Sequence, residues 1–169
     1  DSTVEALSAV VSQKSITLFS TYHVLSKEEL HARTEIYLEQ YSKQINVEAV
    51  TAADMVRRQY LPAVMRHIAA LAEATTNLDA CGMDNSVQQR LLDRLTHHLT
   101  AADRNVDVLE EIALKAQAIP DIRAQAFEYR DEVVPALQAL REEIDALEKV
   151  LPAVVSPVPS YAELLFPLS

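Results

Sequence analysis

The stretch IRAQAFEYRDEVVPALQALREEIDALEKVL, residues 122–151, decides the fold class. Its apolar residues recur in steps of three or four, at Ile122, Ala126, Tyr129, Val133, Leu137, Leu140, Ile144, Leu147 and Leu151. This spacing is typical of the seam along which an amphipathic helix packs on other helices. The heptad repeat has one irregularity, beside Pro135. The stretch therefore predicts a long helix in a bundle.

Other segments share this periodicity. A helix is expected from Ser26 onward, with one face made of Leu30, Thr34, Tyr37, Tyr41 and Ile45. The sequence leaves open whether this helix breaks at Asn46. After it the pattern resumes with Val47, Val50, Asp54, Arg57, Leu61, Val64, Ile68 and Leu71. Residues 86–116 form a further long helix, and residues 3–20 form one or two short ones. We therefore expect an all-α fold, an antiparallel bundle of long amphipathic helices with short N-terminal helices and a Pro-rich C-terminal tail.

Polar residues mark where these helices begin. Ser26 is followed three residues later by Glu29, and Ser86 by Gln89, which is the spacing of a capping box. Pro120 is placed to be the first residue of the helix that follows it. The sequence thus predicts helix starts at these three points.

Pro62 and Gly82 predict a kink and an end in the helix that continues past Asn46. Pro62 lacks an N–H and crowds the carbonyl of Arg58, so a kink is expected there. Gly82 suits the left-handed position just past a helix end. We expect this helix to end next to Gly82.

Composition excludes several classes of function. Gly82 is the only glycine among 169 residues, so a P-loop and a dinucleotide-binding fingerprint are excluded. The formal net charge of −10 argues against binding to nucleic acid or to an anionic membrane surface. Cys81 has no second cysteine with which to form a disulfide or a zinc cluster. With no signal peptide visible, a reducing cytoplasm fits best.

Few residues suggest chemistry. Glu28 and His31 have the ExxH spacing of di-iron bundles, but no second ExxH exists, and a solvated helix start explains them better. Asp93 and His97 make a possible two-ligand metal clip, which is a weak site. His98 lies on the apolar side of its helix, with Leu91, Leu95 and Ala102, where a histidine is usually packed and hydrogen-bonded. The sequence assigns no catalytic, cofactor-binding or metal-binding residue, and it leaves the role of Cys81, His97 and His98 open.

The C-terminal end combines prolines with apolar residues. We divide the chain into a helical bundle over residues 1–155 and a Pro-rich docking tail over residues 156–169. Ser160 and Glu163 have capping-box spacing, so a short helix is expected after them. Because so short a helix is not stable alone, its apolar face should dock on a groove of this bundle or of a neighbouring catalytic domain. The docking residues are Tyr161, Leu164, Leu165 and Phe166.

Three stretches resemble one known family. They cover residues 12–64, 128–151 and 157–166. The first contains EELHARTEI and EQYSKQINVEA, and the third is PVPSYAELLF. Together they resemble the C-terminal region of type III glutamine synthetases, the long bacterial form of that enzyme. The stretches occur in the family's order and span nearly the whole chain.

The resemblance implies that a parent enzyme joins ammonia to glutamate, using ATP and Mg²⁺ or Mn²⁺, as a large ring-shaped oligomer in the cytoplasm. It implies that the nucleotide, metal and glutamate ligands lie in upstream domains. The chain begins with Asp1 rather than Met, so we expect a structural and assembly module whose partners are the upstream catalytic domain and neighbouring subunits. The alternative is a free-standing helical interaction or regulatory module without enzymatic activity, which would bind a partner helix through residues 122–151.

Overall fold

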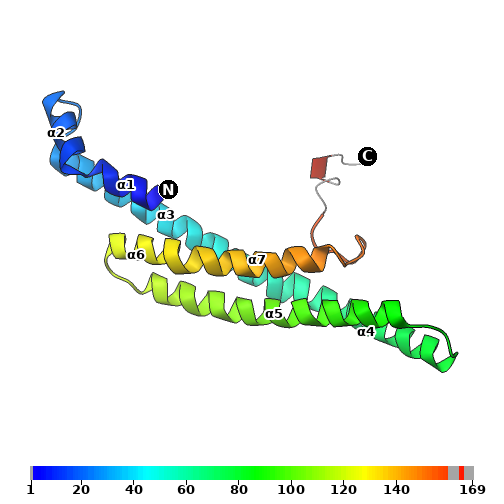
Figure 1. Ribbon diagram of the computed structural model, residues 1–169. Coiled ribbons are helices and arrows are strands. Elements are labelled where there is room, and N and C mark those ends of the chain that lie inside the picture. The colour runs from blue at the N-terminus through cyan, green and yellow to red at the C-terminus, as the bar shows by residue number, and fades with distance from the viewer. Residues whose placement is uncertain (1, 160–163, 166–169) are drawn as a thin grey trace. The chain divides into compact units, whose positions relative to one another are not determined.

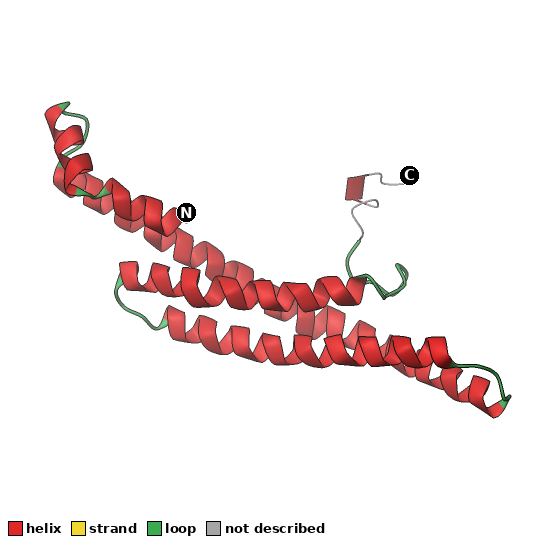
Figure 2. Cartoon of the chain, viewed as in Figure 1, coloured by secondary structure: helices red, strands yellow, loops and turns green. Residues whose placement is uncertain are grey.

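The protein is an all-α helical bundle, as the sequence predicts (Figure 1, Figure 2). The computed structural model describes residues 2–159, 164 and 165. The helices are α1 (Thr3–Val10), α2 (Gln13–Thr21), α3 (Lys27–Met55), η1 (Val56–Tyr60), α4 (Leu61–Ala80), α5 (Ser86–Gln117), α6 (Ile122–Glu128), η2 (Tyr129–Val133) and α7 (Val134–Glu148). None of the helices in this described part combines the length and the apolar character that a membrane span requires.

The chain divides into two compact units, which are described separately. Unit 1 contains residues 1–50 and 110–136, and unit 2 contains residues 51–109 and 137–169. The division at residue 156 inferred from composition stays a prediction.

A small apolar cluster lies at the centre of unit 1. Val4 of α1, Leu38 of α3 and Ala126 of α6 are buried together. Partly buried side chains pack against them, namely Leu7, Tyr41, Ile122 and Phe127. The first short helix is therefore fixed to its unit through Val4.

The core of unit 2 follows the predicted seams of α5 and α7. Its buried apolar residues include Val56, Tyr60, Val64, Leu95, Ala102, Val106, Leu109, Leu140, Ile144, Leu147 and Leu151. Burying each large apolar side chain contributes roughly 1.5–3 kcal/mol. The spacing of residues in the sequence thus identified Val64, Leu140, Ile144, Leu147 and Leu151 of this core.

The buried face of α3 differs from the predicted one. Val47 and Val50, which the sequence placed on the core face, are exposed, and so is Tyr37. Ala49 and Ala53 are buried instead. The prediction favoured larger apolar side chains, whereas the distance between packed helices depends on the side chains at the contact and is short where they are alanine.

The helix starts are capped as predicted at one of three points. The Ser26 N–H donates to Glu29 Oε2 at 2.8 Å, and the Glu29 N–H donates to Ser26 Oγ at 3.1 Å, which completes the capping box before α3. The hydrogen bond from the Ser26 N–H lowers the pKa of the Glu29 carboxyl, and the Ser26 hydroxyl lowers it further by a smaller amount. This cap positions the first turn of α3.

At the second point α5 begins at Ser86 as predicted but without the predicted capping box, and at the third α6 begins at Ile122 instead of Pro120. Ser86 is the first residue of α5, and its N–H donates to the Asp84 carboxylate at 3.0 Å instead of to the Gln89 side chain. Pro120 lies outside α6. Asp121 is the cap, and its Oδ1 accepts the Ala124 N–H at 2.7 Å. Aspartate is a strong N-cap, so the helix begins after Asp121 rather than at Pro120.

A π turn precedes each of the two prolines that stand inside long helices. The Leu61 N–H donates to the carbonyl of Val56, directly before Pro62. The Val134 N–H donates to the carbonyl of Tyr129, directly before Pro135. A π turn holds more residues per turn than an α-helix, so it accommodates one extra residue at each proline. Helical structure therefore continues through Pro62, where the sequence predicted a kink, and through the irregular step of the seam.

Asn46 does not break α3, which continues from Lys27 to Met55. Its Oδ1 accepts a hydrogen bond of 3.0 Å from the hydroxyl of Tyr129. Tyr129 is buried in η2, so this contact ties the π turn to α3 within unit 1. The asparagine is thus used for a contact between helices rather than for a helix end.

Gly82 ends α4 as the sequence predicts. Its φ is +68°. The Gly82 N–H donates to the carbonyl of Asp79 at 2.9 Å, and the Met83 N–H donates to that of Leu78 at 3.0 Å. These two bonds form a Schellman motif, which satisfies carbonyls that the helix end leaves without partners.

Replacing Gly82 with alanine should lower the free energy of unfolding by about 1 kcal/mol. A Cβ at this position meets no atom within 4 Å, so the cost arises from the left-handed backbone alone. Asparagine tolerates that conformation, so Gly82→Asn should lose clearly less stability than Gly82→Ala. Urea unfolding of the three proteins measures the difference, and equal losses for both variants would contradict this explanation.

Candidate docking site

The structure describes two of the four predicted docking residues. Leu164 and Leu165 are helical, and both side chains are mostly exposed. Tyr161, Phe166 and the predicted capping box of Ser160 and Glu163 lie outside the described residues. The docking role of all four residues therefore stays a prediction. Of the two that the structure describes, Leu164 lines a pocket.

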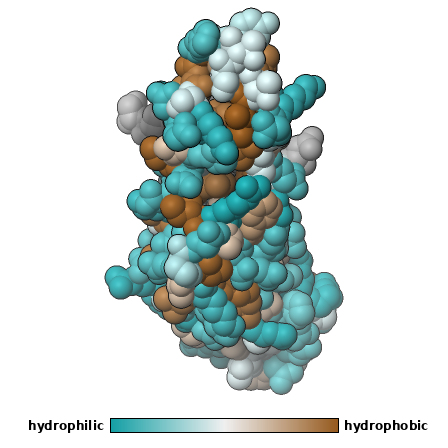
Figure 3. Space-filling view, turned by 90° about the vertical axis from the view of Figure 1, so that its left-hand side faces the viewer, coloured by the Kyte–Doolittle hydropathy of each residue, from teal (hydrophilic) through white to brown (hydrophobic). Residues whose placement is uncertain are grey.

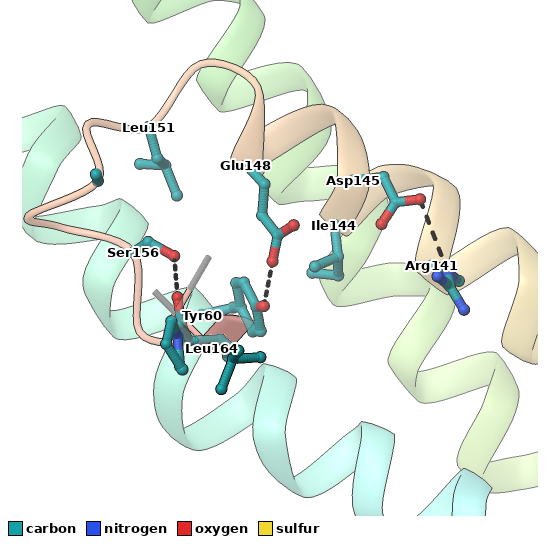
Figure 4. Close-up of a pocket in the computed structure, with 11 residues that line it drawn as sticks. Tyr60, Arg141, Ile144, Asp145, Glu148, Leu151, Ser156 and Leu164 are labelled. Carbon is teal, nitrogen blue, oxygen red and sulfur yellow. Dashed lines mark hydrogen bonds and ion pairs between the residues drawn. The ribbon is translucent and has the colours of Figure 1, made fainter. Parts of the chain in front are cut away.

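Leu164 borders a pocket of about 530 Å³ in unit 2 (Figure 4). One side consists of η1 and α7 residues, and the other is the chain between Leu151 and Pro159. The lining residues are Tyr60, Arg141, Ile144, Asp145, Glu148, Leu151, Ala153, Ser156, Val158, Pro159 and Leu164. The tail thus forms a wall of the pocket.

Turns fix the start of the tail against this pocket. Leu151 is buried and closes the seam of α7. The Val155 N–H donates to the carbonyl of Pro152 at 2.8 Å, and Ser156 Oγ donates to the carbonyl of Val158 at 2.9 Å. Because proline cannot continue a helix, Pro152 redirects the chain into these turns. The backbone from Leu151 to Val158 therefore has a defined path.

Tyr60 and Glu148 form the polar centre of the pocket. The Tyr60 hydroxyl donates a short hydrogen bond to the Glu148 carboxylate, and Figure 4 shows the two side chains pointing toward each other. Burial, and then this carboxylate, raises the pKa of the Tyr60 hydroxyl. One turn away, Arg141 Nε lies 3.7 Å from Asp145 Oδ2. The pocket thus combines apolar side chains, Ile144 and Leu151, with charged ones. Such a lining could bind an apolar peptide segment that carries a polar or cationic group.

Sequence reasoning missed the bond between Tyr60 and Glu148. The two residues are 88 positions apart, and neither belongs to a motif. The nearest signal is Pro62, which marks the π turn that contains Tyr60. Only the packing of η1 near α7 within unit 2 brings the two side chains together.

The weaker candidates do not gather into a larger group among the described residues. Within residues 2–159, 164 and 165, no three His, Cys, Asp or Glu side chains are grouped so as to hold a metal ion, and this covers Glu28, His31, Asp93 and His97. Cys81 is exposed at the end of α4.

His98 is half-buried and hydrogen-bonded, as its position on an apolar edge predicts. Its Nδ1 lies 2.7 Å from Glu143 Oε2, which joins α5 to α7 within unit 2. The ring of His97 meets that of His98 edge to face at 5.1 Å. The first contact joins two helices, whereas the second lies within α5.

Replacing Tyr60 with phenylalanine should lower the free energy of unfolding by about 1–2 kcal/mol, because the Glu148 carboxylate loses a hydrogen-bond donor. Glu148→Gln retains an acceptor and should cost less. Urea unfolding at neutral pH compares the two variants, and a larger loss for Glu148→Gln would contradict this order.

Alkaline pH gives a second test of the same contact. The folded-state pKa of Tyr60 is raised, so its contribution to stability is complete below its ordinary pKa of about 10 and declines as the pH rises above that value. Between about pH 9 and pH 11, the wild-type protein should therefore lose more stability than Tyr60→Phe. Parallel slopes for the two proteins would contradict this effect.

Deleting residues 157–169 should lower the melting temperature, because Val158, Pro159 and Leu164 form part of the pocket wall. Circular dichroism of the full and shortened chains measures the change. An unchanged melting temperature would show that the tail does not stabilise this bundle.

Comparison with known proteins confirms the resemblance. Residues 1–79 match the family described as "Glutamine synthetase C-terminal domain". The chain is 33% identical to the type-3 glutamine synthetase of Dictyostelium discoideum over 98% of its own length. It is 28% identical to a glutamine synthetase of Butyrivibrio fibrisolvens over 94% of its length, and 24% identical to one of Bacteroides fragilis (strain YCH46) over 96%.

The share of each relative that aligns is small and constant. The chain spans 23% of the length of each of these three glutamine synthetases. One of them is named as type 3, and the similarity to it extends over nearly every residue of the chain. The chain therefore belongs to the glutamine synthetase C-terminal domain family, in the form found in type III enzymes.

Proposed function

We propose that this chain is the helical C-terminal module of a type III glutamine synthetase, in which it packs on the catalytic region and supports assembly of the oligomer. The longer enzyme would ligate ammonia to glutamate at the expense of ATP, with Mg²⁺ or Mn²⁺, in the cytoplasm. The role of the module itself would be structural.

One observation carries this proposal. The alignment with the Dictyostelium enzyme uses 98% of this chain but 23% of that protein. The rest of the relative, 100 − 23 = 77% of its length, has no counterpart here. A type III enzyme that contains this module would therefore hold its ATP, metal and glutamate sites in that larger part.

The character of the candidate site supports a docking role. The pocket in unit 2 combines apolar side chains with Glu148, Asp145 and Arg141, and the exposed Leu164 stands at its rim. Such a mixture suits contact with a protein segment. We propose that the segment containing Tyr161, Leu164, Leu165 and Phe166 contributes to this contact.

The purified 169-residue chain should produce no glutamine from ATP, glutamate and ammonia with Mg²⁺ or Mn²⁺. In the full-length enzyme, deleting the module should reduce the mass of the oligomer measured by light scattering, and activity should fall with it. The substitution Met83→Ser, at an exposed side chain outside this pocket, is a suitable control, because it should leave both unchanged.

Two outcomes would contradict the proposal. Glutamine formation by the 169-residue chain would place catalysis in the module. An intact, fully active oligomer after deletion of the module would remove its structural role. A gene that starts at this region, with no synthetase sequence before it, would favour a free-standing interaction module instead.

A further inference from the structure

The second helix has no core of its own. α2, Gln13–Thr21, contains no buried residue. A helix of this length is marginal in water unless its amphipathic face packs on something. α1, by contrast, buries Val4 in unit 1. Although Ile16 and Phe19 are half-buried and Ser15 Oγ donates to the carbonyl of Ala9, α2 adds no fully buried side chain to its unit.

Large apolar side chains are exposed around the end of α2. Leu18 is 54% exposed, Tyr22 72% and Val24 60%. We call these three residues the α2 surface. Single exposed apolar residues are common on proteins, but these three lie within seven consecutive positions. Figure 3, which faces the side of the molecule where α2 is drawn in Figure 1, shows apolar residues reaching the exterior between polar ones.

The charge of this segment differs from that of the rest of the chain. Residues 12–25 contain Lys14 and His23 but no Asp or Glu, although the chain has 25 acidic residues. The centres of protein interfaces are depleted in charged residues and enriched in aromatic ones. The composition of the α2 surface is thus that of an interface centre.

The backbone holds the α2 surface in a defined position. His23 has a φ of +52°, which is uncommon for a residue other than glycine. Its N–H donates to the carbonyl of Ser20 at 3.1 Å, and the Val24 N–H donates to that of Phe19 at 3.0 Å. These bonds form a second Schellman motif. The turn therefore presents Tyr22 and Val24 outward at some cost in backbone strain.

A hollow lies directly beside this turn. It has a volume of about 380 Å³ and is lined by Ser20, His23, Val24, Leu25, Ser26 and Glu29. All of these residues belong to unit 1. A side chain of a partner has room to enter between the end of α2 and the start of α3.

The occupant follows from the family. α2 lies in residues 1–79, which match a domain named as C-terminal, so under the proposed function the catalytic region of the enzyme would precede it. In the relatives that remainder comprises 100 − 23 = 77% of the chain. A second copy of this module would carry the same net charge of −10, which opposes self-association.

We propose that the α2 surface docks into an apolar groove on the catalytic region of the same enzyme. This inference rests on the proposed function and adds the surface that performs it. Docking would supply the apolar burial that α2 lacks in the module.

Hydrogen–deuterium exchange tests the proposal in the full-length enzyme and in the 169-residue chain. Amides of residues 12–25 should exchange at least about tenfold more slowly in the full-length enzyme, because docking suppresses local unfolding of α2. The double variant L18S/Y22S should lose this protection. The control Met83→Ser, at a side chain 60% exposed beyond α4, should retain it. In the 169-residue chain, L18S/Y22S should leave the melting temperature unchanged, because it removes no buried side chain.

The outcomes separate this inference from the proposed function. If other residues of the module become protected in the full-length enzyme but residues 12–25 do not, docking through α2 is wrong and the structural role stands. If no residue of the module becomes protected, both are wrong. Protection of residues 12–25 that rises with the concentration of the 169-residue chain would assign the α2 surface to a second copy and overturn the proposal.

Discussion

Proline inside a long helix is the constraint on which this fold depends. Pro62 and Pro135 each lack the N–H that an α-helix requires, and each follows a π turn by the same number of residues. The wider turn absorbs an extra residue, so that apolar residues before and after it return to the buried side. Each turn also contains a buried tyrosine whose hydroxyl reaches another helix, Tyr60 to Glu148 and Tyr129 to Asn46.

The sequence predicted those features that depend on local spacing. The seam of residues 122–151, the capping box of Ser26 and Glu29, and the left-handed Gly82 are all found in the structure. These succeed because helical periodicity and cap chemistry involve residues only three or four positions apart. Even the irregular step beside Pro135 marks the π turn, although the spacing alone did not specify its hydrogen bonding.

Features that depend on distant partners were not predicted. The burial of Ala49 and Ala53 in place of Val47 and Val50 reflects which helices approach closely, and the periodicity of one helix does not contain that information. The pocket of unit 2 likewise depends on Tyr60. The capping box at Ser86 is absent because Asp84 accepts the Ser86 N–H. The start at Pro120 is wrong because Asp121 caps the helix through the Ala124 N–H.

The chain contains both a well-buried core and an exposed apolar surface. α5 and α7 bury a continuous seam in unit 2, whereas α2 and the turn after it hold large apolar side chains outside any core. A module that stabilises itself in one part and exposes an uncharged face in another is suited to be fixed to a larger protein. Attachment to a larger protein is the role we propose for it.

Cross-linking from Lys14 tests this attachment most directly. Lys14 is the only lysine within residues 12–25, and it stands on α2 next to the α2 surface. In the full-length enzyme, an amine-reactive cross-linker analysed by mass spectrometry should connect Lys14 to lysines of the catalytic region. Cross-links from Lys14 that reach only other lysines of the module, under conditions in which the catalytic region reacts normally, would contradict the account.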